Sequence, residues 1–473
     1  MTSAGDWAEE DFGTAKLGDE RRTRRLVAVA AEVAARPAGT VTRACASSAS
    51  REGAFRLLES RRVHVDAVRA ATHAASARRC ADQDRVFVAV DASVLSVTDE
   101  KKRKELGNIG SRRLSGLHVM SALAVDADGT ALGICAQETW VRNQRSPHSG
   151  RKRSLPDVPS ETRHWIEVLE TSHALLEKEA PGCQPWFQLD RGADCWQVFD
   201  WASAKGALIT VRATHDRRLD SHVGRLWKTV ENSRVIATEK VKVASRRPVP
   251  RAKRIGNKKV RKTMTPARQA RIAAVRIRAK SVTLSLVTLT GERLSRSLNA
   301  VLVKEVRAPK DDAIEWMLLT THPISSRKDV LNVIAGYSMR WRIEDFHRAW
   351  KRGLCRVEDT QLRSRSAIEK WATILAAVAT RAMNLSKLAR TTPDVPATEA
   401  LSAAEIRALI ALREPKGVRL DFVPNLGQAV RWIADLGGYT GPWNGPPGPT
   451  VIGRGLHDVM VAARVVERVH KMR

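Results

Sequence analysis

The spacing of hydrophobic positions changes near residue 77, and this change divides the chain. Before it, apolar residues recur every three or four positions, as at Leu26, Val29, Ala30 and Val33. That spacing places them on one face of a helix. We therefore predict short helices joined by turns from residue 5 to about residue 76.

After residue 77, short apolar runs replace the helical spacing. Residues 85–91 and 186–190 each form a buried-strand pattern that ends in an acid. Residues 117–125 and 131–140 flank Asp-Ala-Asp-Gly, a hairpin-turn signal. Residues 161–178 have the pattern of an amphipathic helix. Strands in hairpin order followed by alternating strands and helices predict an α/β core with a mixed sheet.

A basic segment interrupts this order between residues 213 and 310. Residues 240–291 contain no acid, and residues 246–262 are dense in Lys and Arg and read as a loop. Residues 275–289 then alternate like strands. We predict a β-rich insertion with a phosphate-binding surface, the alternative being a solvated loop. Further on, we predict a strand at 316–321, and helices at 329–351, 367–390 and 456–469.

Charge limits the possible partners. Lys and Arg number 81 against 51 acids, a net charge of +30. Such a charge destabilises a compact chain unless an anion compensates it. No stretch approaches the roughly 18 apolar residues of a membrane span, and the first residues lack a signal-peptide pattern. We expect a cytoplasmic protein that binds nucleic acid and no membrane, although ribosomal proteins share this charge.

Two acids at predicted strand ends suggest metal chemistry. Phosphodiester cleavage with divalent metal needs several carboxylates that converge on one point, and hard oxygen ligands suit Mg²⁺ or Mn²⁺. Asp91 and Asp190 each end a predicted strand. For either aspartate taken alone, the alternative is a structural role, because aspartate often begins a turn.

The predicted helix near residue 340 carries a row of polar side chains. With Tyr337 at zero and about 100° per residue, Arg340 falls near 300°, Glu344 near 340° and Lys351 near 320°. Glu344 could complete a metal site, and the other three could hold phosphates. The alternative is an amphipathic helix with intrahelical ion pairs. Glu344 and Lys351 lie two turns apart, which is too far for such a pair.

These four residues form the pattern Tyr-x-x-Arg-x-x-x-Glu-x-x-x-x-x-x-Lys. This pattern resembles the signature of bacterial DDE transposases of the insertion-sequence-four family. Residues 17–27 (Leu-Gly-Asp-Glu-Arg-Arg-Thr-Arg-Arg-Leu-Val), Glu52-Gly-Ala-Phe-Arg and Leu436-Gly-Gly are also similar. The resemblance covers nearly the whole chain.

The resemblance implies a ribonuclease-H-like catalytic core in which Asp91, Asp190 and Glu344 are the catalytic, metal-binding triad. It implies two Mg²⁺ or Mn²⁺ ions per active site. Arg212 matches an arginine that contacts DNA. Trp316 matches a tryptophan that packs around a flipped base. The alternative for Trp316 is ordinary packing in the core. Predicted DNA contacts also include residues of the first long helix: Arg21, Arg22, Arg24 and Arg25.

The predicted fold class is therefore α/β, with a ribonuclease-H-like mixed-sheet catalytic core flanked by helical N- and C-terminal domains. We expect a helical DNA-end-binding domain at 1–76 and a core at 77–365 that contains the insertion at 213–310. A helical dimerisation domain is expected at 366–473. Double-stranded DNA, both transposon inverted-repeat ends and target, is the expected partner, bound by a homodimer on paired ends in the bacterial nucleoid.

The expected reaction is cut-and-paste DNA transposition, with nicking of the ends, hairpin formation and resolution, and strand transfer. Three other classes of protein are the alternatives. A tyrosine recombinase is disfavoured because the chain has only Tyr337 and Tyr439, and the signature above accounts for the first. Two alternatives stay open. One is a nuclease with this core that does not transpose, and the other is a DNA-binding protein that has lost catalysis.

Overall fold

The computed structural model divides the chain into two compact units. Unit 1 comprises Met1–Phe187 and Met339–Arg473, and unit 2 comprises Gln188–Ser338. The structure describes residues 4–99, 104–109, 114–142, 161–220, 224–243, 248–255, 259–265, 267–288, 290–309, 312–441 and 447–471. Within these residues, no helix is both long enough and apolar enough to cross a membrane.

Unit 1 begins with helices, as the sequence predicts. They are α1 (Ala4–Phe12), α2 (Glu20–Ala35), α3 (Val41–Ala44), α4 (Ser48–Glu59) and α5 (Val65–Arg78). Asp19 caps α2 by accepting a hydrogen bond from the backbone N–H of Arg21. Ser47 and Ser50 cap α4 reciprocally. Leu26, Val29 and Val33 are buried, so the predicted face of α2 is its core face.

The strands of unit 1 are β1 (Arg85–Ser96), β2 (Gly107–Asn108), β3 (Ser115–Val125), β4 (Ala131–Trp140) and the first part of β5 (Gln184–Leu189), within which the unit boundary falls. Their order is β2-β3-β1-β5, with β4 paired to β3. The predicted hairpin turn is present: Asp126 accepts the N–H groups of Asp128 and Thr130, and Gly129 has a φ of +85°.

Strand β1 is longer than predicted, and this moves Asp91 away from a strand end. Antiparallel pairing with β3 continues past the Asp91↔Ser121 pair to Ser96↔Gly116. The prediction that Asp91 ends its strand was therefore wrong. The apolar run stops at the acid, but the backbone of β3 still offers hydrogen-bond partners to the residues beyond it.

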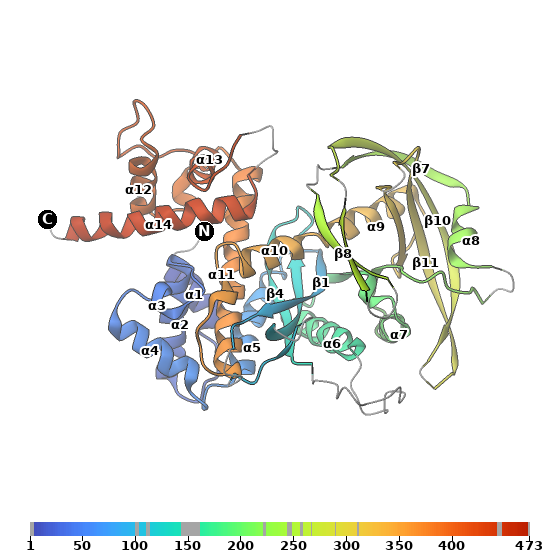
Figure 1. Cartoon of the computed structure of the whole chain (residues 1–473), viewed down its shortest axis with the longest axis horizontal. Helices are drawn as coiled ribbons and strands as arrows, with labels where there is room; N and C mark the ends of the chain where they lie inside the picture. The colour runs from blue at the N-terminus through green and yellow to red at the C-terminus, as the bar shows by residue number, and fades with distance from the viewer. Residues whose placement is uncertain are drawn as a thin grey trace. The chain divides into compact units, whose positions relative to one another are not determined.

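The later helices of unit 1 are α6 (Thr162–Glu179), α10 (Arg342–Lys351), η2 (Val357–Asp359), α11 (Arg365–Thr391), η3 (Ala397–Glu399), α12 (Ala403–Arg413), α13 (Leu426–Leu436) and α14 (Pro449–Lys471). Helix α11 runs beside the N-terminal helices (Figure 1). The Trp371 indole donates to the Gly39 carbonyl at 2.8 Å. One buried cluster joins α1–α5, β3, α10 and α11.

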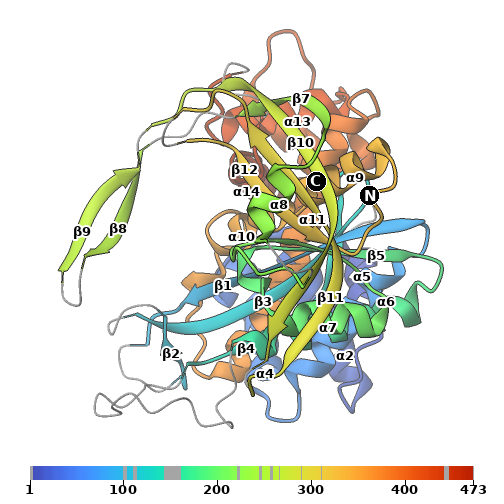
Figure 2. The same cartoon turned by 90° about the vertical axis from the view of Figure 1, so that its right-hand side faces the viewer.

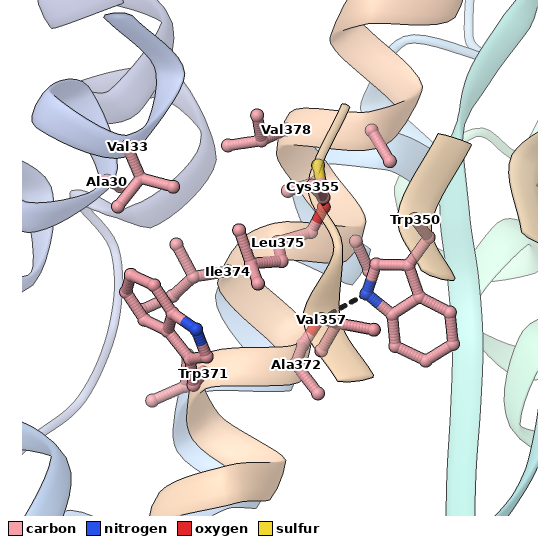
Figure 3. Packing of buried hydrophobic residues seen from close by; sticks show 14 of the residues in the cluster. Ala30, Val33, Trp350, Cys355, Val357, Trp371, Ala372, Ile374, Leu375 and Val378 are labelled. Atoms are coloured by element: carbon pink, nitrogen blue, oxygen red, sulfur yellow. Dashed lines mark hydrogen bonds between the residues drawn. The ribbon is translucent and has the colours of Figure 1, made fainter. Parts of the chain in front are cut away.

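Figure 3 shows part of this cluster, in which Trp350 of α10 donates its indole N–H to the Ala372 carbonyl of α11 at 3.0 Å. Trp350 and Trp371 are fully buried. Each large ring thus fills the core while its one polar atom is satisfied. Helix α10 consequently packs against both β1 and α11.

Unit 2 contains a separate set of strands and helices. They are η1 (Arg191–Ala193), α7 (Trp196–Lys205), β6 (Leu208–Arg212), α8 (Leu226–Glu231), β7 (Val235–Val243), β8 (Val249–Ile255), β9 (Lys259–Thr265), β10 (Arg271–Val287), β11 (Arg293–Glu305), β12 (Glu315–Thr320) and α9 (Arg327–Met339). The sheet order is β6-β12-β11-β10-β7, and neighbouring strands are antiparallel.

Two predictions from the pattern need correction here. The basic stretch read as a loop contains strands β8 and β9, which pair antiparallel and form a hairpin outside the main sheet (Figure 2). The predicted helix 329–351 is two helices, α9 and α10. Ile343 and Glu344 donate to Arg340 and Trp341, three residues back, so the α-helical ladder is interrupted there.

The fold as a whole is mixed α/β, with a large sheet and helical ends, and is consistent with a ribonuclease-H-like core. All six cysteines are free thiols, and five of them are buried.

Candidate active site

Two predicted catalytic carboxylates come together in unit 1. Asp91 lies on β1 and Glu344 on the first turn of α10. A carboxylate oxygen of each and a ring nitrogen of His347 lie within 4.8 Å of one another. The pairing of Asp91 with Glu344 therefore needs no rearrangement of unit 1.

His347 is a member of this group that the sequence reasoning missed. Its ring is buried, and its Nε2 has no hydrogen-bond partner among the described residues. Burial, and then the charges of Lys351 and Arg340, lower the pKa of His347 to about 3. The imidazole is therefore neutral near pH 7 and keeps a nitrogen lone pair. The available signal was its position three residues after Glu344, which places both on one helical face.

Two predicted cations border the carboxylates. Arg340 Nη1 lies 3.2 Å from Asp91 Oδ2, and both side chains are 13% exposed. Lys351 Nζ donates to Ser93 Oγ at 3.2 Å and lies 3.6 Å from Glu358. These low exposures matter because charges are screened less when they are partly buried. Arg340 is therefore a direct counter-charge to Asp91, and Lys351 is held beside Ser93 on the same strand.

Glu358 is a second acid that the sequence did not single out. It lies on η2, where its Oε1 accepts the Ser96 N–H at 3.0 Å and faces Lys351 at 3.6 Å. A three-residue 3₁₀ turn has no periodicity from which its position could be predicted. Its contacts secure the end of β1 and orient Lys351.

The donor set of this group fits a divalent cation. Two carboxylates offer hard oxygen ligands, and the neutral imidazole offers a nitrogen. The unpartnered Nε2 of His347 supports this fit, because a buried polar atom without a partner is costly. One Asp91 oxygen accepts from the Ala92 N–H at 2.8 Å and the other from Arg340, so a bound cation would share this carboxylate with Arg340.

The remaining predicted core residues belong to unit 2. Asp190 follows β5 and accepts the Gly192 N–H at 2.7 Å. Arg212 ends β6 and donates to the Glu315 carbonyl at 3.1 Å. Trp316 on β12 is half-buried, and its ring meets the edge of Tyr337 at 5.6 Å. Tyr337 and Trp316 are thus neighbours within unit 2.

The predicted N-terminal arginines lie at the start of α2. Arg21, Arg24 and Arg25 are exposed, and Arg22 is half-buried and donates to the Leu17 carbonyl at 2.9 Å. Arg24 lies 3.6 Å from Glu20, which is a solvent-exposed pair and therefore weak. Arg22 thus has a structural contact, while the exposed three present positive charge to the solvent.

Carboxylates that converge beside cations are typical of enzymes that act on phosphodiesters with a divalent metal. Residues 158–381 match the family described as the transposase DDE domain, and residues 4–63 match the family described as transposase DNA-binding. The chain is a DDE transposase of the insertion-sequence-four type, with an N-terminal DNA-binding domain. The first match includes Asp190 and Glu344, and Asp91 lies between the two matches.

Proposed function

We propose that this DDE transposase moves DNA by a cut-and-paste pathway similar to that of the transposon-five transposase. In this pathway one strand is nicked at each transposon end. The freed 3′-hydroxyl attacks the opposite strand to form a hairpin, the hairpin is reopened, and the 3′-ends attack target DNA. The observation that carries the proposal is the grouping of Asp91, Glu344 and His347 within 4.8 Å in a chain that matches the transposase DDE family.

Asp91 and Glu344 are proposed to hold Mg²⁺ or Mn²⁺, with Asp190 as the third carboxylate of the triad and two ions per site. When bound, such ions activate the attacking oxygen and stabilise the leaving one. The buried, neutral His347 supports this role because it can contribute a nitrogen to the same ion or orient Glu344. Arg340 partly neutralises Asp91 before any cation arrives.

Arg340 and Lys351 are proposed to hold DNA phosphates next to the cleaved bond, and Tyr337 and Arg212 to contact the DNA backbone. Trp316 is proposed to receive a base flipped out of the transposon end. Its half-burial supports this, because a wholly buried ring would have no face left for a base. Stacking on an aromatic ring offsets part of the cost of unstacking the base.

The active species is proposed to be a homodimer on two paired ends, with residues 366–473 supplying the contact. Exposed apolar side chains on α14 support this region: Val461 is 45% and Val465 is 62% exposed. Apolar side chains exposed on one helix suit a partner surface.

The proposal is tested by incubating purified protein with a pooled library of linear double-stranded DNA ends and Mg²⁺. We expect hairpin ends and joined products from the wild type. Glu344→Gln should lose cleavage by three or more orders of magnitude while it keeps DNA binding. The matched control is Asp345→Asn on the same helix turn, because Asp345 contacts Arg342 and Arg348 instead of the candidate site.

Each other outcome selects a different class. Metal-dependent cuts without hairpins or joined products, from a library that contains a bound end, would indicate a nuclease. Equal cutting by wild type and Glu344→Gln would remove Glu344 from the site. Tight binding with no cutting by any variant would favour a DNA-binding protein that has lost catalysis.

A further inference from the structure

A second group of metal-ligating side chains lies in unit 1, on elements that the candidate active site does not use. Glu138 is on β4, and His164 and Glu167 are one turn apart on α6. One ligand atom from each lies within 4.8 Å of the other two. His164 Nδ1 is 2.7 Å from Glu138 Oε1 and 3.4 Å from Glu167 Oε2.

The orientation of the His164 ring is set by its neighbours. The Trp140 indole stacks on it with ring centres 3.9 Å apart and an angle of 17° between the planes. His118 stacks on Trp140 in turn at 5.4 Å. The His164 side chain is only 8% exposed, and burial is the largest cause that lowers its pKa. The ring is thus held with Nδ1 directed at two carboxylates.

The group contains a carboxylate oxygen whose hydrogen bonding is not satisfied. Glu138 Oε2 is buried and has no partner among the described residues, although its twin Oε1 faces His164. A buried carboxylate oxygen without a partner is costly. A cation bound between the acids would satisfy it.

The charges around the group leave room for a cation. Arg163 is 2.6 Å from Glu167 Oε1, which is the oxygen turned away from His164. Glu167 Oε2 still faces the histidine at 3.4 Å. Burial, and then Glu167, raise the pKa of Glu138 to about 8. Arg163 and then Arg69 oppose this rise; in the described structure Arg163 pairs with the far oxygen of Glu167, and no ion pair joins Arg69 to either acid of the group. The two carboxylates and the His164 ring thus leave a small space between them in which a divalent cation would fit.

We propose that Glu138, His164 and Glu167 form a second metal site, separate from the candidate active site, for a divalent transition-metal cation of the Zn²⁺ type. One imidazole nitrogen and two carboxylate oxygens match the ligands that Zn²⁺ takes in proteins. Mg²⁺ prefers oxygen ligands and retained water. The bound cation would join the last residues of β4 to the first turn of α6, the elements on either side of residues 141–161.

The experiment measures Zn²⁺ binding to the full chain by equilibrium dialysis, with Glu344→Gln in every sample to weaken binding at the active site. We expect about one tightly bound Zn²⁺ per chain in this background. Adding Glu138→Gln or Glu167→Gln should weaken that binding about tenfold or more. The matched control is Glu170→Gln, which removes the same charge from an exposed position on α6 and should leave binding unchanged.

Co²⁺ serves as a second probe, because its visible spectrum reports nitrogen and oxygen ligands in place of thiolates. Weak bands in the visible region that vanish in Glu167→Gln support the site. Glu167 is partly exposed, so this variant should fold even if Glu138→Gln does not, and circular dichroism checks both. Zn²⁺ binding that Glu167→Gln leaves unchanged would overturn the proposal. So would the absence of tight Zn²⁺ binding in the Glu344→Gln background.

Discussion

His347 contributes a buried, neutral nitrogen to the candidate active site. A protonated histidine there would repel a cation, but burial and the neighbours Lys351 and Arg340 lower its pKa to about 3. The same cations lie next to the carboxylates: Arg340 contacts Asp91 directly. The candidate site therefore contains acids with nearby cations and one uncharged nitrogen donor.

We predict that His347→Gln raises the Mg²⁺ concentration needed for half-maximal DNA cleavage by about tenfold or more. The cause would be the loss of the ring nitrogen that faces Asp91 and Glu344. The measurement is the initial cleavage rate against Mg²⁺ and Mn²⁺ concentration, and added metal should restore much of the rate.

The control for this prediction is a change on the exposed side of α10, Arg348→Gln, which should leave the metal dependence unchanged. A rate loss in His347→Gln that no metal concentration restores would point to a structural role for the ring.

At the scale of elements, the interruption between α9 and α10 determines where the second helix begins. The hydrogen bonds at Arg340 and Trp341 span three residues, so α10 starts a new helix instead of continuing α9. Glu344 and Asp345 then fall in its first turn and Lys351 in its last. This charge order is favourable for the helix dipole, so α10 is stabilised by the same acid and base that the signature requires.

Helix α2 makes an element-scale prediction about DNA binding. Replacing its three exposed arginines, Arg21, Arg24 and Arg25, by glutamine should weaken DNA binding and make it less sensitive to salt. Each lost phosphate contact lowers the slope of log K against log salt by about 0.9 on duplex DNA. Binding is measured by fluorescence anisotropy between low and moderate salt.

A matched triple change on the C-terminal helices, Arg407→Gln, Arg413→Gln and Arg431→Gln, removes the same charge and serves as the control. If both triple variants lower the salt slope equally, net charge explains binding and α2 has no special part in it.

At the scale of the molecule, the N-terminal helices depend on a helix that follows the core in the chain. Trp371 of α11 donates to Gly39, and Lys370 Nζ donates to the Ser60 and Val63 carbonyls at 3.0 Å. Lys370 is almost wholly buried, and such burial is tolerated where the ammonium is hydrogen-bonded. The DNA-binding region therefore shares its core with α11.

We predict that residues 1–76 produced alone will not form a stable domain. The fragment would expose the apolar residues that α11 covers, and roughly 1.5 to 3 kcal/mol is lost for each large side chain that is left uncovered. Proton NMR dispersion and thermal unfolding by circular dichroism measure this.

The comparison sample is the same fragment joined by a flexible linker to residues 365–391, the residues of α11. If the linked chain folds and the unlinked fragment does not, the result would support the shared core. A folded, cooperatively melting fragment 1–76 would contradict it.

Much of the architecture was predictable because it depends on local patterns. The apolar face of α2, the turn at Asp126–Gly129 and helix α6 all follow from spacing and turn chemistry within about twenty residues. The end of β1 was not predictable, because its extension past Asp91 depends on the backbone of β3. The α9–α10 interruption was also missed, because no proline marks it and the one nearby glycine, Gly336, lies inside α9.

The sequence by itself determined the chemical inventory of this protein: its basic charge, the acids Asp91, Asp190 and Glu344, and the spacing of the transposase signature. Those properties reside in residue type and order. Only the tertiary structure decided that His347 joins Asp91 and Glu344, that Tyr337 packs on Trp316, and that α11 completes the N-terminal core. These contacts join residues that are far apart in the chain. They form because the residues are buried together, and local spacing does not encode burial.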